Sequence, residues 1–376
     1  MKSNPLKELE KLGQSIWLDY IRRDLITSGQ LRRLIEEDGL RGMTSNPSIF
    51  EKAILESHVY DDAIRDPVFA GKDAKEIYEA LSLRDVQSAA DVFRPVYDKT
   101  SGRDGYVSLE VNPHLAHDTD GTIQEARRLW ASLDRPNVFI KVPATDEGLP
   151  AIRQLISEGI NVNVTLLFGL PRYRHVTEAY MAGIEDRIAQ GKPVNTVASV
   201  ASFFVSRMDT LVDPLLQKLC EQQGDKAGLA KQLLGQVAVA NSKAAYQIYK
   251  ETFAGERFRK LARHGARIQW LLWASTSTKN PQYSDVKYVD ELVGPDTINT
   301  VPLNTLDAYR DHGDPKVRIE QDVDRAYWVL EQLPGLGIDI DRVTQQLEDE
   351  GDEKFSEPFD KLMETLGKVL PKHAAS

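Results

Sequence analysis

The stretch 137-NVFIKVPATDEGLPAIRQLISEGINVNVTLL-167 decides the fold class. It contains a short run of apolar and β-branched residues at 137–142, an amphipathic segment with helical periodicity at 149–158, and a second apolar run at 161–167. A strand, a helix and a second strand in this order are typical of a parallel β-α-β unit. The predicted fold class is therefore α/β with a parallel sheet.

The same alternation continues on both sides of this stretch, and the number of strands separates two architectures. A doubly wound sheet usually has fewer strands than a barrel, and it usually carries a glycine-rich turn that binds phosphate. The sequence contains neither of the two usual forms of that turn, GxGxxG and GxxxxGK[ST]. Eight strands predict a single (β/α)8 TIM barrel domain over residues 1–376. The predicted strands are 15–20, 42–45, 105–111, 137–142, 161–167, 196–203, 267–274 and 296–302, and further helices are expected at 122–133, 171–190 and 285–293.

Three segments are longer than a minimal barrel needs. Residues 47–104 and 208–266 are predicted to be helical insertions, and 318–370 to form C-terminal helices that cap the barrel or pack across its rim. No Pro/Gly/Ser-rich linker separates them from the barrel. The helices expected in the last two segments are 208–222, 227–253, 318–332, 340–349 and 355–370.

Composition limits the possible functions. The net charge of −10 argues against nucleic acid as a partner, although a few local cations can still bind a small phosphate. Cys220 is the single cysteine, which excludes an internal disulfide and a cysteine-based metal cluster. The longest uncharged runs are too short to span a membrane. We therefore expect a cytoplasmic protein without a nucleic-acid or membrane partner.

One lysine stands within the apolar strand 137–142. Both faces of a strand in a parallel barrel are covered, so Lys141 is expected to be buried. Burial disfavours the ammonium form, and a neutral lysine amine can form a Schiff base with a carbonyl. The alternative is a lysine that reaches solvent at the strand end or pairs with a carboxylate.

Polar side chains on the neighbouring strands favour the catalytic interpretation. Glu110 ends the third strand, and Asn163 and Thr165 alternate with apolar residues along the fifth. The carboxyl ends of barrel strands meet at one face, where barrel enzymes have their active sites. A carboxylate, an amine, an amide and a hydroxyl on three successive strands predict an active site.

Other polar residues follow the remaining strands. Asp19 ends the first strand and Asn46 follows the second, although a helix cap is an alternative explanation for Asp19 and the start of a turn for Asn46. Ser202, Arg207 and Lys279 lie near the ends of strands six and seven, where they are suited to bind a phosphate. The spacing of His114 and His117 is not that of a zinc-binding helix, so no metal site is predicted.

These motifs resemble those of the transaldolases and occur in the same order. The resemblance runs from Asp19 to the C-terminal helices, and the chain length and the insertion at 208–266 are similar to the longer bacterial subfamily. It implies a barrel of the Schiff-base (class I) aldolase type that acts in the pentose phosphate pathway (pentose shunt) and needs no metal or organic cofactor. The matching segments are Thr44-Ser-Asn-Pro-Ser48, Ser108-Leu-Glu-Val111, Phe139-Ile-Lys-Val-Pro143, Gly159-Ile-Asn-Val-Asn-Val-Thr-Leu-Leu-Phe168 and Ser202-Phe-Phe-Val-Ser-Arg207.

The resemblance also implies roles for the catalytic residues. Lys141 would form a Schiff base with fructose 6-phosphate or sedoheptulose 7-phosphate. Glu110 would move protons through a water that Thr165 also holds. Asp19 would take the proton of the C4 hydroxyl, so that the C3–C4 bond breaks and a dihydroxyacetone unit stays on the lysine.

The remaining roles concern binding. Asn46 and Asn163 would hold the dihydroxyacetone unit until glyceraldehyde 3-phosphate or erythrose 4-phosphate accepts it. Arg207 matches the phosphate-binding arginine of the family, and Ser202 and Ser275 match pocket serines. Shorter members place a second arginine soon after the latter serine, where this chain has Thr276-Ser-Thr-Lys279. Lys279 is therefore the candidate second phosphate contact, as a point charge without a bidentate fork.

Two other functions stay open at this point. One is a Schiff-base aldolase that releases free dihydroxyacetone, and the other is a sugar-phosphate-binding barrel without catalysis. A homodimer is compatible with the resemblance and is the commonest assembly of soluble proteins.

Overall fold

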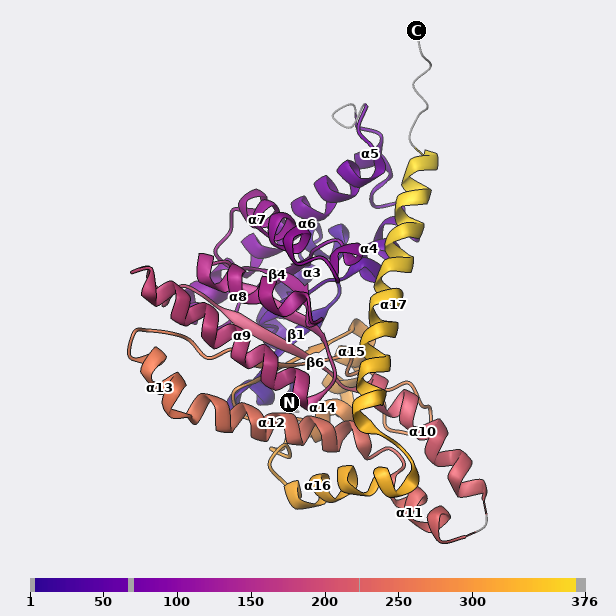
Figure 1. Cartoon of the computed structure of the whole chain (residues 1–376). Helices are drawn as coiled ribbons and strands as arrows, with labels where there is room; N and C mark the ends of the chain where they lie inside the picture. The colour runs from indigo at the N-terminus through magenta and orange to yellow at the C-terminus, as the bar shows by residue number, and fades with distance from the viewer. Residues whose placement is uncertain (1–3, 67–70, 223, 370–376) are drawn as a thin grey trace.

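Eight parallel strands close into a barrel in chain order, and β1 pairs with β8. The computed structural model describes residues 4–66, 71–222 and 224–369 (Figure 1). All eight predicted strands are confirmed, with ends that differ by up to three residues from those expected. The strands are β1 (Gln14–Asp19), β2 (Gly42–Thr44), β3 (Val107–Glu110), β4 (Val138–Pro143), β5 (Val162–Leu167), β6 (Ser199–Phe204), β7 (Trp270–Ala274) and β8 (Thr297–Val301).

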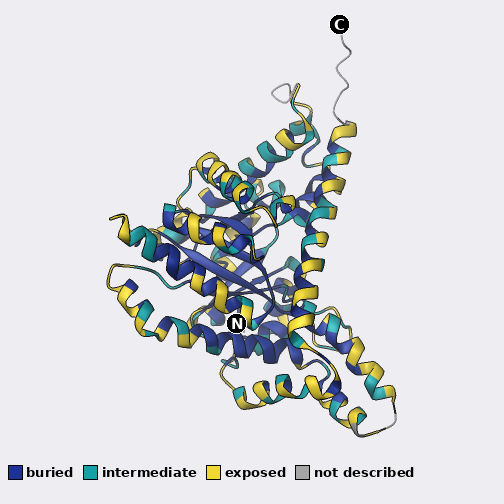
Figure 2. Ribbon diagram, viewed as in Figure 1, coloured by how far each residue is buried: buried dark blue, intermediate teal, exposed yellow. Residues whose placement is uncertain are grey.

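Helices surround the barrel, and their outer faces are the exposed surface of the molecule (Figure 2). α7 begins three residues before the predicted start at 122, because Asp118 caps it and accepts a hydrogen bond from the backbone N–H of Gly121 at 2.9 Å. The helices that alternate with strands are α1 (Pro5–Lys11), α2 (Arg23–Thr27), α3 (Gln30–Arg33), α7 (Thr119–Leu133), α8 (Gly148–Glu158), α9 (Leu170–Ala189), α14 (Lys287–Glu291) and α15 (Leu303–His312). A π-helical turn at Leu34–Asp38 and a 3-10 turn at Pro113–Leu115 complete this layer.

The two long connections are helical, as expected, but the helix predicted at 227–253 is wrong as a single element. It is two helices, because Gly235 has a φ of +66° and donates its N–H to the Asp213 carboxylate, which ends the first helix. The first connection contains α4 (Pro47–Leu55), α5 (Asp61–Ile64) and α6 (Ala74–Lys99), and the second contains α10 (Ser206–Glu221), α11 (Asp225–Leu233), α12 (Val237–Ala254) and α13 (Glu256–Ala262).

The C-terminal segment differs most from the prediction. α16 (Val323–Gln332) forms, but the two helices expected at 340–349 and 355–370 are one helix, α17 (Ile340–Val369), with a 3-10 turn at Pro334–Leu336 before it. Figure 1 shows α17 as a long yellow helix that passes α4 and α10. Gly351 lies inside this helix and does not end it. A glycine is needed there for close packing, because a Cβ would lie 2.9 Å from Leu166 Cδ2. Residue 370, the predicted end of the last helix, lies outside the described residues.

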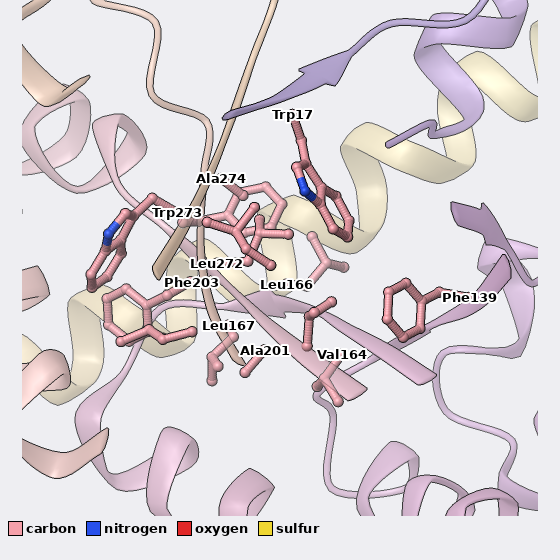
Figure 3. Close-up of a cluster of buried hydrophobic side chains, with 14 of the residues drawn as sticks. Trp17, Phe139, Val164, Leu166, Leu167, Ala201, Phe203, Leu272, Trp273 and Ala274 are labelled. Atoms are coloured by element: carbon pink, nitrogen blue, oxygen red, sulfur yellow. The ribbon is translucent and has the colours of Figure 1, made fainter. Parts of the chain in front are cut away.

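The amino-terminal half of the barrel interior contains a stack of aromatic side chains. Trp17 stacks with Phe139 at a centroid distance of 6.2 Å, and Phe139 stacks with Tyr106 at 4.3 Å. Gly42 makes room for the indole, because a Cβ there would lie 2.4 Å from the Trp17 ring. Figure 3 shows Trp17 and Phe139 among the buried hydrophobic side chains of the protein, with Phe203 and Trp273 apart from them. Polar side chains lie at the opposite end of the barrel interior, at the carboxyl ends of the strands. No helix in the described ranges is long and apolar enough to cross a membrane.

The second insertion is fastened to the barrel by a buried carboxylate, Asp209 of α10. It accepts hydrogen bonds from the Ala238 backbone N–H at 2.7 Å, the Tyr288 hydroxyl at 2.9 Å and the Lys287 ammonium at 3.1 Å. Asp209→Ala leaves the Ala238 N–H and the Tyr288 hydroxyl without this acceptor and removes the carboxylate partner of Lys287, which still donates to the Gly235 carbonyl at 2.6 Å. We therefore expect it to lower the free energy of unfolding by about 3–5 kcal/mol in urea denaturation. The control Asp186→Ala removes the exposed ion pair with Arg153 and should cost less than about 1 kcal/mol. Equal losses in the two variants would contradict a structural role for Asp209.

Candidate active site

Lys141 lies inside the barrel, between Glu110 of β3 and Asn163 of β5 in the strand register. It is 4% exposed, so the expected burial is confirmed and the alternative of a lysine that reaches solvent is wrong. Its Nζ donates to Glu110 Oε2 at 3.3 Å and to the carbonyl oxygen of Ser45 at 3.2 Å. The lysine is therefore paired with a carboxylate, as one alternative held, and this carboxylate is the predicted catalytic one.

Glu110 is a buried carboxyl group that contacts the lysine directly. Burial raises the pKa of Glu110, and the positive charge of Lys141 opposes this effect. A carboxyl group that keeps its proton to higher pH than usual is suited to give and take protons near neutral pH. The Glu110–Lys141 pair can therefore exchange a proton at a distance of one hydrogen bond.

Asp19 lies across the barrel mouth and is fixed by the strands on both sides of β1. Thr44 of β2 donates to Asp19 Oδ1 at 2.7 Å, and the same hydroxyl pairs with that of Thr300 on β8 at 2.8 Å. Desolvation raises the pKa of Asp19, while the charge of Lys141 and the bond from Thr44 lower it. Asp19 does not cap a helix, since the residue that precedes α2 is Arg22. Its carboxylate is held instead by the hydroxyl of Thr44 on the neighbouring strand.

Thr44 and Thr300 received no role from the sequence. Thr44 lies two residues after Gly42, which faces Trp17 inside the barrel, so strand periodicity predicts that Thr44 also faces inward. The sequence pattern does not show the bond from Thr44 to Asp19, which joins residues 25 positions apart and depends on the parallel pairing of β1 with β2, where the two residues are register partners.

Asn163 is held by two hydroxyl groups. Its Nδ2 donates to Ser108 Oγ at 3.0 Å, and its Oδ1 accepts from Ser202 Oγ at 2.7 Å. Thr165, two residues further along β5, has a buried hydroxyl without a hydrogen-bond partner in the described part of the chain. A register shift between β5 and β6 and a positive φ of 54° at Leu166 follow it directly. The irregular strand end therefore lies next to a hydroxyl group without a partner.

Asn46 has a structural role, but it caps a helix and does not start the turn that the sequence offered as an alternative. It is the N-cap of α4, and its side chain accepts from the backbone N–H of Ile49 at 3.0 Å. Pro47 occupies the first position of the helix. The same residue also lines the cavity described next, so the cap sets the position of the amide at the cavity wall.

The mouth of the barrel contains a cavity of about 430 Å³, within the range of small-molecule sites. Glu110, Asn163 and Thr165 are not in its wall, but Glu110 bonds to Lys141 and Asn163 bonds to Ser202. The predicted residues that line the cavity are Asp19, Asn46, Lys141, Ser202, Arg207, Ser275 and Lys279. The wall residues without a predicted role include Tyr20, Thr44, Ser48, Lys52, Phe204, Ser277, Thr300 and Phe355.

Three cations other than Lys141 line this cavity. Arg207 lies in the first turn of α10, and its Nη1 is buried without a hydrogen-bond partner among the described residues. Lys279 donates to Ser277 Oγ at 2.6 Å, and desolvation and the charge of Arg207 lower its pKa. The charge of Lys52, from α4, lowers the pKa of Lys279 further, so these cations lie near one another. An unsatisfied guanidinium, two ammonium groups and a helix N-terminus are suited to bind a phosphate.

Ser275 connects the two cation-bearing segments. Its φ is 54°, its carbonyl accepts the Ser206 N–H at 3.0 Å, and the two hydroxyl groups are 3.1 Å apart. This unusual backbone holds the end of β7 against the start of α10. The arrangement brings the Lys279 loop close to Arg207.

His114 and His117 pair with carboxylates. His114 contacts Asp360, and His117 contacts Glu147 and Asp352. Within the described ranges, no three His, Cys, Asp or Glu side chains are placed to share a metal ion.

Fold and site together define a (β/α)8-barrel enzyme with a buried lysine and carboxylate at its catalytic face and a cluster of cations nearby. A family model described as transaldolase/fructose-6-phosphate aldolase matches residues 16–366. The chain belongs to this transaldolase family. A transaldolase of Trichodesmium erythraeum is 48% identical over 376 residues, with 99% of each chain covered.

Other relatives are similar over the same extent. A transaldolase of Frankia alni is 47% identical over 369 residues, with 98% of each chain covered. A transaldolase of Thiobacillus denitrificans is 46% identical over 364 residues, which covers 97% of this chain and 100% of the relative. The likeness therefore includes the helical insertions and α17 as well as the barrel.

Proposed function

We propose that this enzyme transfers a dihydroxyacetone unit from a ketose phosphate to an aldose phosphate through a Schiff base on Lys141. The observation that carries the proposal is the buried Lys141–Glu110 pair at one side of a cavity that is also lined by Asp19 and by Arg207, whose Nη1 has no hydrogen-bond partner among the described residues. Sugar phosphates are the substrate class that combines a carbonyl for the lysine with an anion for the cations.

The first step forms the imine. Lys141 Nζ gives a proton to Glu110 and attacks the C2 ketone, which yields a carbinolamine. Glu110 returns the proton to the departing C2 hydroxyl, so that water leaves and a protonated imine forms. The distance of 3.3 Å between the two groups supports this exchange, either directly or through a water bound by the free hydroxyl of Thr165.

The second step breaks the carbon chain. Asp19 takes the proton of the C4 hydroxyl, the C4 oxygen forms a carbonyl, and the electrons of the C3–C4 bond move into the protonated imine. The aldose phosphate leaves and an enamine of dihydroxyacetone stays on Lys141. The bond from Thr44 holds the Asp19 carboxylate in place for this step.

The third step requires that the three-carbon unit is kept. Asn163, oriented by Ser108 and Ser202, and Asn46 at the cavity wall would hold its hydroxyl groups. An aldose phosphate then enters, the enamine attacks its carbonyl, and the first two steps run in reverse. Retention of this unit distinguishes a transferase from an aldolase.

Product analysis tests this function against the alternative of an aldolase. The family model covers both activities, while the full-length relatives named above are transaldolases, which favours transfer. With fructose 6-phosphate and erythrose 4-phosphate we expect one sedoheptulose 7-phosphate for each ketose consumed. Free dihydroxyacetone in stoichiometric amounts over many turnovers without an acceptor would contradict the proposal.

The cations give a separate prediction about phosphate binding. Arg207→Ala is expected to raise KM for fructose 6-phosphate about 10- to 100-fold with a smaller change in kcat, because one charge-assisted hydrogen-bond donor is lost. Lys279→Ala and Lys52→Ala should have smaller effects, since both ammonium groups are more exposed. Steady-state kinetics measure these values, with Arg153→Ala as a surface control. An unchanged KM in Arg207→Ala would remove Arg207 from the phosphate site.

We also propose the wider setting that the sequence suggests. A net charge of −10 supports the absence of a nucleic-acid partner, and the single cysteine supports a cytoplasmic location. One continuous hydrophobic core supports a single barrel domain over residues 1–376 with its insertions. A homodimer is the assembly to be tested, by light scattering.

A further inference from the structure

The helix α17 lies against the catalytic face of the barrel. It contacts α4, α6, α10 and the end of β5. Ion pairs attach it at intervals along its length: Glu348 to Arg172 at 3.3 Å, Asp352 to His117 at 3.7 Å and Asp360 to His114 at 2.7 Å. These contacts hold the helix in one position relative to the cavity.

Phe355 is the side chain that α17 places at the cavity. It is 4% exposed and lines the wall. The centre of its ring is 5.6 Å from Lys141 Nζ and 5.8 Å from Arg207 Cζ. Gly351, one turn earlier, lets the helix pack closely on Leu166 and Arg207, which sets the depth of the ring. Phe355 therefore lies between the amine that forms the imine and the cation that binds phosphate.

An aromatic ring at this place affects a protonated imine in two ways. Its face attracts a positive charge within about 6 Å, and the effect is strongest where water is excluded. Its bulk also occupies the space from which water would reach the C2 carbon. The hydrogen bonds from Asn46 and Asn163 hold the three-carbon unit, but they do not exclude water.

Loss of the unit to water would follow a defined course. A proton adds to C3 of the enamine, which restores the protonated imine, and water adds to C2 and passes a proton to the nitrogen. The C2–N bond then breaks, which leaves the Lys141 amine and free dihydroxyacetone, with one water consumed in total. An enzyme that transfers the unit must slow this hydrolysis relative to attack on the acceptor.

We propose that Phe355 is a specificity-determining residue that covers the Lys141 imine and directs the enzyme toward transfer and away from hydrolysis. The proposal rests on the Schiff base proposed above. The substrates are those proposed above. Phe355, on the C-terminal helix, determines whether the dihydroxyacetone unit on Lys141 is transferred or hydrolysed.

The test compares Phe355→Ala and Phe355→Leu with Phe359→Ala. Phe359 lies one turn further along α17 and packs on Tyr78 and His114, outside the catalytic cavity. For each variant, the free dihydroxyacetone released from fructose 6-phosphate is measured relative to transfer to erythrose 4-phosphate. We expect this ratio to rise at least about tenfold in Phe355→Ala, which corresponds to the loss of one desolvated cation–π contact, less in Phe355→Leu, and not at all in Phe359→Ala.

The outcomes separate this proposal from the proposed function. A wild-type ratio in folded Phe355→Ala, or the same rise in Phe359→Ala, overturns the role of Phe355 while the Schiff base stands. Absence of an adduct on Lys141 in the wild-type enzyme instead overturns the proposed function. If Phe355→Ala does not fold, as judged by circular dichroism, Phe355→Leu decides: a raised ratio supports the proposal, and a wild-type ratio overturns it.

Discussion

Lys141→Ala is expected to lower kcat by at least about four orders of magnitude, as removal of the nucleophile does in other enzymes with covalent catalysis. We expect neither Lys52 nor Lys279 to replace the buried amine, because both are more exposed and line the cavity with Arg207, where we propose that the phosphate binds. Borohydride added during turnover of fructose 6-phosphate should trap a three-carbon adduct on the peptide that contains Lys141.

Lys243 provides an internal control for this experiment. It is also a buried lysine, but it lies on α12, and its Nζ donates to the carbonyl of Gln321 at 2.8 Å, away from the cavity. Its peptide should stay unmodified, and Lys243→Met should retain the wild-type kcat. If Lys141→Ala turned over normally while Arg207→Ala lost substrate binding, the barrel would be a binding module or would use another mechanism.

Glu110→Gln is expected to slow imine formation and turnover about 10²- to 10⁴-fold, the usual range for a general acid–base group. Glutamine has nearly the same size but cannot carry the proton between Lys141 and the departing hydroxyl. KM for the ketose phosphate should change little, because Arg207, Lys279 and Lys52 are unaltered. Single-turnover trapping and steady-state kinetics measure the two effects.

The pH profile gives an independent check on Glu110. Because burial raises its pKa, the protonated acid persists to higher pH than in an exposed glutamate and is lost as pH rises through the raised value. We therefore expect the alkaline limb of the kcat profile to flatten in Glu110→Gln. The acid limb should stay, since the raised pKa of Asp19 means that this base becomes protonated, and inactive, as pH falls. Weaker substrate binding with unchanged kcat and an unchanged profile would make Glu110 structural.

Most of the barrel was predictable because its signals are local. Strand alternation and helix periodicity act over a few residues, and the eight strands were placed to within three residues of their observed ends. The same alternation put Glu110, Lys141 and Asn163 on the inner face, and the barrel then made them neighbours. The prediction was wrong about the division into helices at two places where glycine acts through distant contacts: Gly235 bonds to Asp213 of another helix, and Gly351 packs on Leu166 of a strand.

What the sequence by itself determined is the α/β barrel, the burial of Lys141 and the set of polar groups around it, because each depends on a short-range pattern. What only the tertiary structure decided is how these groups are held: the bond from Thr44 to Asp19, the position of Lys52 near Lys279, and the ring of Phe355 over Lys141. Phe355 is separated from Lys141 by more than half of the chain, and helical periodicity says only that one face of α17 is apolar. Which surface that face covers is set by the closed barrel and the ion pairs along the helix.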